Sequence, residues 1–256
     1  MAEQNESNDT IPTNLRLLFV LEELANAGVP MTPTEINQQL GLPKPTIHRL
    51  FATLENEGFL QREIDGRAYT PGRRLRRLSM GVLSSLRVRT ARLSVLNALA
   101  EHIGETCNIA VPDRDAMLYI DRVETKWPLR IQLPIGTHVP FYCTASGKTY
   151  LSMLKKAHLE RYVGSVTLEP KTPKTITDPE ALLDEIGKTR ARGFGQDNEE
   201  FMEGMIAIAV PIIDVHGRLV STLSFHAPTQ RLTLKDAEVH LERLRAGAKD
   251  LAQLLV

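Results

Sequence analysis

The 256-residue sequence has little of several features that mark particular classes of protein. Its two cysteines, Cys107 and Cys143, are too few for a disulfide framework or a cysteine-rich zinc site, so we expect reduced thiols in a reducing compartment. The longest apolar runs, such as Ile206–Ile213, fall well short of the roughly 20 residues of a membrane span, and the polar N-terminus is unlike a signal peptide. The sequence therefore predicts a cytoplasmic protein without a membrane partner.

Net charge is also lacking, because 31 lysines and arginines balance 31 aspartates and glutamates. A zero net charge neither requires nor excludes nucleic acid as a partner, since binding depends on local clusters of basic residues. What the chain does have is length and 42% hydrophobic residues, enough for two buried cores. We predict a disordered head over residues 1–10, a helical domain over 11–71, a linker helix over 72–88 and a mixed α/β domain over 89–256.

Residues 14–57 show the patterns of three short helices. A first helical period starts at Asn14 and ends near Gly28. Residues 32–35 read Thr-Pro-Thr-Glu, a capping box with proline at the first helical position, which predicts a brief helix to Leu40. After a short turn, prolines at 43 and 45 suit another helix start. The buried stripe of this third helix is predicted to be Ile47, Leu50, Phe51 and Leu54.

A hairpin is predicted after the third helix. Phe59–Arg62 and Arg67–Thr70 are short strand candidates around Asp65-Gly66, a strong two-residue turn signal. Two helices joined by a glycine-containing turn and followed by a strand pair are typical of a winged helix-turn-helix, whose second helix reads DNA. The predicted DNA-binding residues are Lys44, Pro45, Thr46, His48, Arg49, Thr53, Arg62 and Arg67. A winged-helix module that binds protein instead of DNA remains an alternative.

The linker helix begins with an arginine cluster at residues 73–77. Those arginines either approach DNA phosphates or form a solvated face beside a dimer contact. The apolar stripe of this helix, which we predict to contribute to a homodimer or homotetramer, is Leu75, Leu78, Val82 and Leu86. A second helix over Thr90–Ile103 leads into the C-terminal domain.

The C-terminal domain is predicted to be an antiparallel sheet covered by helices, which makes the fold class α+β. The strand candidates are Thr106–Val111, Met117–Val123, Leu129–Leu133, Met205–Ile213 and Leu219–His226. The helix candidates are Ala145–Lys155, Pro179–Arg192 and Leu234–Leu254, the last of them after Thr233, a good cap.

The most informative chemistry of the C-terminal half is at residues 143–149. If Thr144 caps a helix that begins at Ala145, the amides of the first turn have no partner inside the helix and form an anion site suited to a carboxylate. The string Gly147-Lys148-Thr149 also resembles a nucleotide-binding loop. That loop needs a glycine where this chain has Tyr142, so we predict no nucleotide cofactor.

Several motifs in the correct order resemble the IclR family of bacterial transcriptional regulators. They are residues 42–50 (Leu-Pro-Lys-Pro-Thr-Ile-His-Arg-Leu), residues 54–60 (Leu-Glu-Asn-Glu-Gly-Phe-Leu) and residues 144–148 (Thr-Ala-Ser-Gly-Lys). The resemblance runs from about Ile11 to the C-terminus. It implies a winged helix-turn-helix, a linker helix and a GAF-like effector domain, with dimers or dimers of dimers on a partly palindromic operator.

The resemblance also implies an effector pocket made of the 145–147 helix start, an acidic loop and the last two strands. Its motifs place Ala145, Ser146, Asp197, Ser224 and His226 there, and Trp127, Phe141, Met202 and Met205 are candidate apolar walls. Two departures matter, because Ala207 and His226 stand where family members that bind very small oxoacids carry a cysteine and a second serine. These two departures favour a larger carboxylate as the effector, and aromatic carboxylates are among the candidates.

Catalysis is the rival class of function. Cys143 and Ser146 are conceivable nucleophiles and His138 or His226 conceivable bases, but no nucleophile-elbow motif and no triad order exist. The seven histidines show no paired metal-ligand spacing. We therefore predict no enzyme, no metal and no cofactor, but a DNA-binding regulator, a repressor by default, that senses a small carboxylate.

Overall fold

The computed structural model describes residues 11–63, 66–83, 86–128 and 130–254. The chain divides into two compact units, the first ending at residue 85 and the second beginning at Leu86. Three predictions lie outside the described residues: the disordered head at 1–10, Asp65 of the hairpin turn and Leu129 of a predicted strand. None of the described helices is long and apolar enough to cross a membrane.

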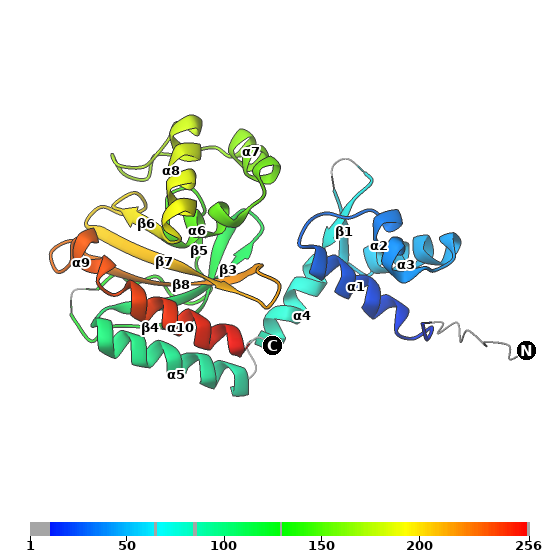
Figure 1. Ribbon diagram of the computed structural model, residues 1–256, viewed down its shortest axis with the longest axis horizontal. Helices are drawn as coiled ribbons and strands as arrows, with labels where there is room; N and C mark the ends of the chain where they lie inside the picture. The colour runs from blue at the N-terminus through cyan, green and yellow to red at the C-terminus, as the bar shows by residue number, and fades with distance from the viewer. Residues whose placement is uncertain (1–10, 64–65, 84–85, 129, 255–256) are drawn as a thin grey trace, which may run out of the picture. The chain divides into compact units, whose positions relative to one another are not determined.

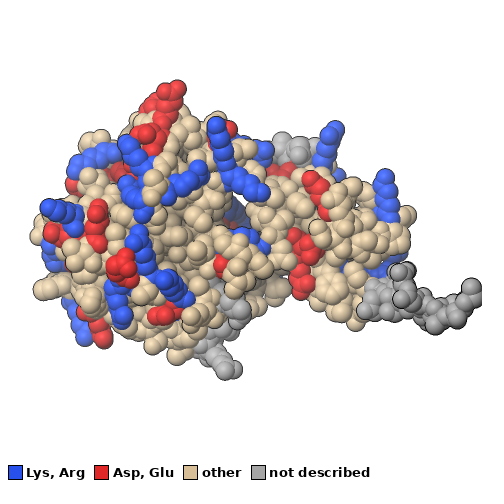
Figure 2. All heavy atoms as spheres, in the orientation of Figure 1, with Lys and Arg blue, Asp and Glu red and all other residues tan. Residues whose placement is uncertain are grey.

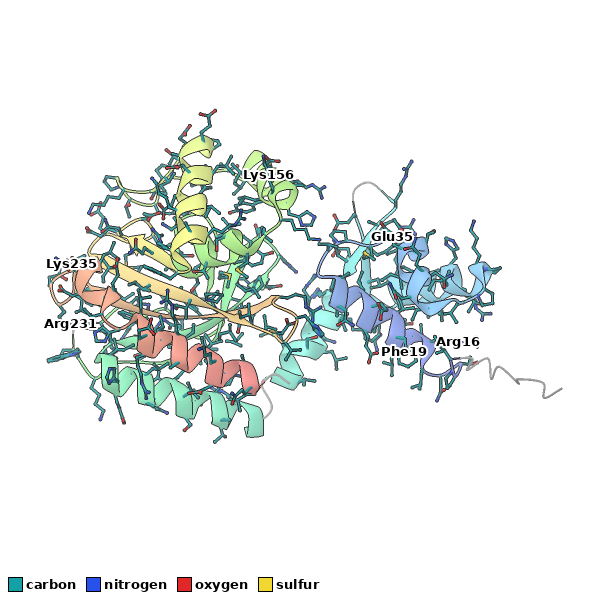
Figure 3. All side chains as sticks on the ribbon, viewed as in Figure 1. Arg16, Phe19, Glu35, Lys156, Arg231 and Lys235 are labelled. Carbon is teal, nitrogen blue, oxygen red and sulfur yellow. The ribbon has the colours of Figure 1, made fainter. Side chains whose placement is uncertain are left out.

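The first unit is a small helical domain with a two-stranded hairpin (Figure 1). Its elements are α1 (Arg16–Ala27), α2 (Pro33–Leu40), α3 (Lys44–Asn56), β1 (Leu60–Arg62), β2 (Tyr69–Pro71) and α4 (Arg73–Leu83). The predicted capping box forms, because the Thr32 amide donates to the Glu35 carboxylate over 2.7 Å, and Thr32 Oγ1 accepts from the Glu35 amide. Glu35 is labelled on α2 in Figure 3. The core joins α1, α2, α3 and the hairpin through Val20, Leu24, Ile36, Ile47, Phe51, Leu54, Leu60 and Tyr69.

The second unit contains a six-stranded sheet in which every neighbouring pair is antiparallel, in the order β5-β4-β3-β8-β7-β6. The strands are β3 (Thr106–Asp113), β4 (Ala116–Val123), β5 (His138–Pro140), β6 (Gly195–Asn198), β7 (Met205–Ile213) and β8 (Leu219–Pro228). The central strands β3, β7 and β8 are buried along most of their length, as expected for a sheet covered on both faces.

Helices cover both faces of this sheet (Figure 1). The long helices α5 (Leu86–Ile103) and α10 (Leu241–Gln253) pack on one face, preceded at α10 by the short α9 (Leu234–Glu238). The other face carries α6 (Ala145–Met153), on which α8 (Pro179–Arg192) packs, and α7 (Lys156–Ser165) packs on α8. The predicted fold class is confirmed: a helix-turn-helix unit with a hairpin, followed by an α/β unit built on an antiparallel sheet.

Two predicted elements of the second unit are wrong. Residues 130–133 form no strand, because the carbonyl of Ile131 accepts from the Arg122 side chain instead of a neighbouring strand, and the edge position belongs to β5. The predicted helix 234–254 is broken between α9 and α10. There the amides of Val239 and His240 bond carbonyls three residues back, which closes a tight turn, and the His240 ring packs on Phe225 at 5.8 Å.

Three further differences concern the helices and strands around the site. The helix predicted to end at Lys155 ends at Met153, because Leu154 is extended and Arg190 binds its carbonyl. No pattern in the sequence predicted α7. The supposed acidic loop begins as strand β6, whose Asp197 pairs with Ala207 of β7.

Candidate functional site

The outer face of α3 carries the polar side chains that the sequence predicts to read DNA. Ile47, Phe51 and Leu54 are buried in the unit's core, which turns the opposite side of the helix to solvent. That side presents Lys44, Pro45, His48, Arg49 and Thr53 as exposed residues and Thr46 as half-buried. The helix therefore has the amphipathic layout of a recognition helix that packs on its domain and presents polar groups to base edges.

The turn before α3 is held by a residue that the sequence analysis missed. The Asn37 side chain donates to the Leu42 carbonyl over 2.8 Å and accepts from the Leu42 amide over 3.0 Å. Gly41 takes the left-handed conformation that ends α2, with φ of 60°. These two hydrogen bonds hold the turn that connects α2 to α3.

The two arginines of the hairpin differ in their surroundings. Arg62 forms two bonds of 2.7 and 3.0 Å to the Glu55 carboxylate on α3, and its guanidinium lies 4.9 Å from the Tyr69 ring centroid. The Arg62 hydrogen bond holds the pKa of Glu55 below its ordinary value. Arg62 thus links the hairpin to α3 although its side chain is exposed, and Arg67 is exposed near the hairpin tip. On the face shown in Figure 2, basic side chains are interspersed with acidic ones over both units.

The start of α6 in the second unit has the helix cap that the sequence predicts. Thr144 caps the helix, and its Oγ1 accepts from the Gly147 amide over 3.1 Å. The two preceding amides, of Ala145 and Ser146, lie ahead of the first intrahelical bond. Gly147 is required here, because a Cβ atom at this position would overlap the backbone of Phe141.

The register of the sheet explains which side chains face this helix start. Asp197, Ala207 and His226 lie side by side on β6, β7 and β8. Ala209 and Ser224, two residues along β7 and β8, point to the same face. A second glycine, Gly195 on β6, lets the helix approach, because a Cβ atom there would overlap the Ala145 carbonyl. The row has the small Ala207 between the polar Asp197 and His226, which leaves a hollow under α6.

This hollow is a small cavity lined mostly by buried side chains. Its volume of about 10 Å³ is at the lower limit of what one water molecule needs. It is lined by Tyr119, Thr144, Ala145, Ser146, Asp197, Phe201, Met205, Ala207, Ser224 and His226. The structure thus brings together seven of the ten residues that the sequence suggests for the pocket. It adds Thr144, which the sequence predicts only as the helix cap, and Tyr119 and Phe201, which no sequence signal singled out.

His226 is oriented by a relay of buried side chains. A guanidinium nitrogen of Arg122 donates to Asn108 Oδ1 over 3.0 Å, so the Asn108 amide nitrogen faces His226 Nδ1 at 3.3 Å. Since an amide nitrogen only donates, Nδ1 accepts, and the neutral ring carries its proton on Nε2. Burial, and then the charge of Arg122, lower the pKa of His226 to about 3. Nε2 is buried without a hydrogen-bond partner among the described residues, and His226 lines the cavity.

Asp197 is the matching buried acid. Its Oδ1 accepts from the amides of Glu200 over 2.8 Å and Phe201 over 3.3 Å, whereas Oδ2 has no partner within the described part of the chain. Burial, followed by the charge of Glu200, raises the pKa of Asp197 to about 7. Glu200 itself pairs with Lys148 of α6, a fully buried ion pair that ties the loop after β6 to the helix.

Three predicted apolar walls lie elsewhere. Trp127 is 53% exposed on the connection after β4, with the Arg231 guanidinium 5.6 Å from its ring centroid; Arg231 is labelled in Figure 3. Phe141 is buried, but its ring packs on Tyr150 with 4.7 Å between the ring centroids, and Phe141 does not line the cavity. Met202 is partly exposed, and its neighbour Phe201 lines the cavity instead. The sequence alone could not show that these three side chains lie outside the cavity lining.

Comparison with known proteins assigns the chain to a family. The model described as IclR helix-turn-helix domain matches residues 15–63, and the model described as Bacterial transcriptional regulator IclR C-terminal matches residues 80–253. The chain belongs to the IclR family. It is a DNA-binding transcription regulator with a C-terminal effector domain, as the motifs of the sequence predicted.

Individual relatives agree over nearly the whole length. A probable transcriptional regulator SauR of Cupriavidus necator is 37% identical over 247 residues, 96% of this chain and 98% of that protein. The transcriptional repressor IclR of Escherichia coli is 30% identical over 220 residues, 85% of this chain and 80% of that protein. The crystal structure of the Thermotoga maritima IclR has a TM-score of 0.63 at 29% identity and covers 94% of this chain and 97% of its own. These IclR-family relatives are named as transcriptional regulators or repressors and not as enzymes.

Proposed function

We propose that this IclR-family regulator is a repressor that leaves its operator when the cavity under α6 binds a small carboxylate. The observation that carries the proposal is that the α6 start and His226, whose buried Nε2 has no partner among the described residues, line one small cavity. Amide groups at a helix start and an imidazole N–H are the donors that a carboxylate accepts from. Repression is supported by the name of the Escherichia coli relative, the transcriptional repressor IclR.

The size of the cavity favours a compact aliphatic carboxylate over the larger or aromatic one that the two sequence departures suggested. A carboxylate group is larger than one water molecule, so any carboxylate must move part of the cavity lining, and a compact aliphatic one must move it least. An aromatic ring would have to displace Phe201 or Met205, both of which line the cavity.

DNA binding is proposed for the outer face of α3, with Arg49 and His48 at base edges and Lys44 at a phosphate. Arg67 of the hairpin is a second phosphate contact, while Arg62 positions the hairpin through Glu55. A single winged helix covers few base pairs, so specific binding calls for two or more copies. The linker helix α4 offers a contact, because Leu78 and Val82 are 56% and 63% exposed.

A thermal-shift screen followed by gel shifts tests this proposal. The purified protein is screened against short aliphatic and aromatic carboxylates, and each hit is added to its complex with the DNA upstream of its own gene. We expect a short carboxylate to raise the melting temperature and release the DNA. Failure to shift any upstream fragment would instead indicate a winged-helix module that binds protein, and sustained turnover of an ester panel would indicate an enzyme.

A further inference from the structure

The two oxygens of the buried Asp197 carboxyl are used differently. Oδ1 accepts two backbone hydrogen bonds from the loop after β6, whereas Oδ2 is buried without a partner among the described residues, and Asp197 lines the cavity. Asp197 is 1% exposed. If this carboxyl takes up a proton, the proton belongs on Oδ2, because both acceptor bonds of Oδ1 then remain in place. The protonated acid therefore presents an O–H donor to the cavity.

The other polar groups of the cavity are mostly donors. The start of α6 contributes amides, Ser146 and Ser224 contribute hydroxyls, and His226 contributes Nε2–H. An ionised Asp197 would be the one anion among the cavity-lining side chains that the structure describes, and it would face any anionic ligand across a space about one water wide. Two carboxylates held that close in a buried site do not both stay ionised.

We infer that the effector enters as an oxyanion together with one proton from solvent, which Asp197 holds on Oδ2 and donates in a hydrogen bond to the ligand. The inference rests on the proposed carboxylate-binding function and specifies the chemistry of that site. Binding leaves one negative charge in the cavity instead of two. Asp197 thereby selects ligands that offer a hydrogen-bond acceptor oxygen at this position over ligands that offer a hydrogen-bond donor.

The groups around Asp197 leave this acid as the one expected to titrate with ligand near neutral pH. Burial raises the pKa of Cys143 to about 12 and also raises that of Tyr119, and the pKa of His226 is lowered to about 3. These three side chains therefore stay neutral from pH 6 to pH 8.5. Glu200, whose pKa burial raises, is paired with Lys148 and lies outside the cavity lining.

The inference predicts a particular pH dependence of ligand affinity. Burial raises the pKa of Asp197 to about 7, so the acid is mostly protonated at about pH 6 and mostly ionised at about pH 8.5. If only the protonated form binds, the apparent Kd rises about 30-fold between those pH values, and close to one proton is taken up per ligand at the higher pH.

Isothermal titration calorimetry of the full-length protein tests this, with acetate, propionate and glycolate as probes. Each probe is titrated at both pH values, in buffers of different ionisation heat so that proton uptake is counted. Asp197→Asn is the decisive variant, because the asparagine carbonyl keeps the two backbone bonds and its amide nitrogen replaces the Oδ2–H donor. We expect it to bind with the wild-type affinity of pH 6 at both pH values.

Glu199→Gln is the matched control. It makes the same carboxylate-to-amide change two residues away, on a side chain that bonds Gly204 and Lys174 outside the cavity. This variant should keep the wild-type pH profile.

The possible outcomes separate the inference from the proposed function. Binding by wild type with no pH dependence, or a pH dependence that persists in Asp197→Asn, overturns the inference alone. Glycolate bound far more tightly than acetate, with binding lost in Asp197→Asn, would show that an ionised Asp197 accepts from a ligand hydroxyl, and it overturns the inference as well. If no probe binds at either pH, the compact-carboxylate proposal fails and the inference fails with it.

Discussion

Replacing His226 by phenylalanine isolates the one buried donor that β8 contributes to the cavity. Phenylalanine keeps a ring of similar volume in the row beside Ala207 but has no Nε2–H. It also leaves the Asn108 amide without the acceptor that Nδ1 provides. The substitution therefore has two separable effects, one on ligand affinity and one on stability.

The effect on affinity follows from the loss of one hydrogen bond to a charged group. Such bonds contribute about 1.5–3 kcal/mol, so the carboxylate Kd should rise roughly 10- to 150-fold. The Asn108 amide nitrogen is left buried and unbonded in the variant, which should cost about 1–3 kcal/mol of folding free energy. Operator affinity in the absence of ligand should not change, because α3 lies in the other unit.

The effect on stability depends on pH in a direction set by the lowered pKa of His226. The unfolded chain protonates this residue below its ordinary value of 6.5, whereas the folded chain does so only near 3. The stabilisation by neutral His226 is therefore complete above pH 6.5 and is lost as the pH falls through this window. At about pH 5 the free energy of unfolding of the wild type should therefore have fallen by about 2 kcal/mol more than that of the phenylalanine variant.

Calorimetric ligand titrations and urea unfolding at about pH 7.5 and pH 5 measure the two effects. The raised pKa of Asp197 acts in both proteins and so cancels in the comparison. Thr222→Val, a buried substitution on the same strand, should change stability without changing ligand affinity. A phenylalanine variant with wild-type ligand affinity would remove His226 from the binding site, and equal acid sensitivity in both proteins would refute the buried neutral histidine.

Three other variants test the DNA-reading helix, the oligomer contact and the packing of α6. Arg49→Ala should weaken operator binding by about 1–3 kcal/mol in a gel shift and leave carboxylate binding intact, and an unchanged operator affinity would remove α3 as the reading helix. Replacing Leu78 and Val82 together by aspartate should lower the solution mass in sedimentation, whereas an unaltered oligomer would place the contact elsewhere. Gly147→Ala should lower the melting temperature and abolish carboxylate binding, because its Cβ overlaps the Phe141 backbone; normal melting and binding would contradict that packing.

Elements with strong local signals were predictable from the sequence. The helix α8 begins and ends where its cap and stop residues indicate, with Asp178 bonding the Ala181 amide and Gly193 in the left-handed conformation. Strand β7 matches its predicted bounds because a continuous apolar run fits a strand covered on both faces. In the site, the Thr144 cap and its open amides follow from residues adjacent in the chain.

Features that depend on contacts distant in sequence were not predictable. The relay that orients His226 comes from Asn108, 118 residues away, and from the Arg122 side chain on another strand. That same arginine binds the Ile131 carbonyl, where a strand was predicted. Trp127 is of a residue type that often lines pockets, but the sequence does not reveal that the connection after β4, which carries it, lies away from α6.

The most direct test of the account is the affinity of a carboxylate for the protein with and without operator DNA. Because the two sites belong to one linked equilibrium, a ligand that releases the operator must bind the operator complex more weakly, by the same factor by which it weakens DNA binding. We predict that the Kd of the best short carboxylate from the screen rises on saturation with operator, and that the two factors agree. The same Kd with and without operator would contradict the proposal that this cavity controls the release of DNA.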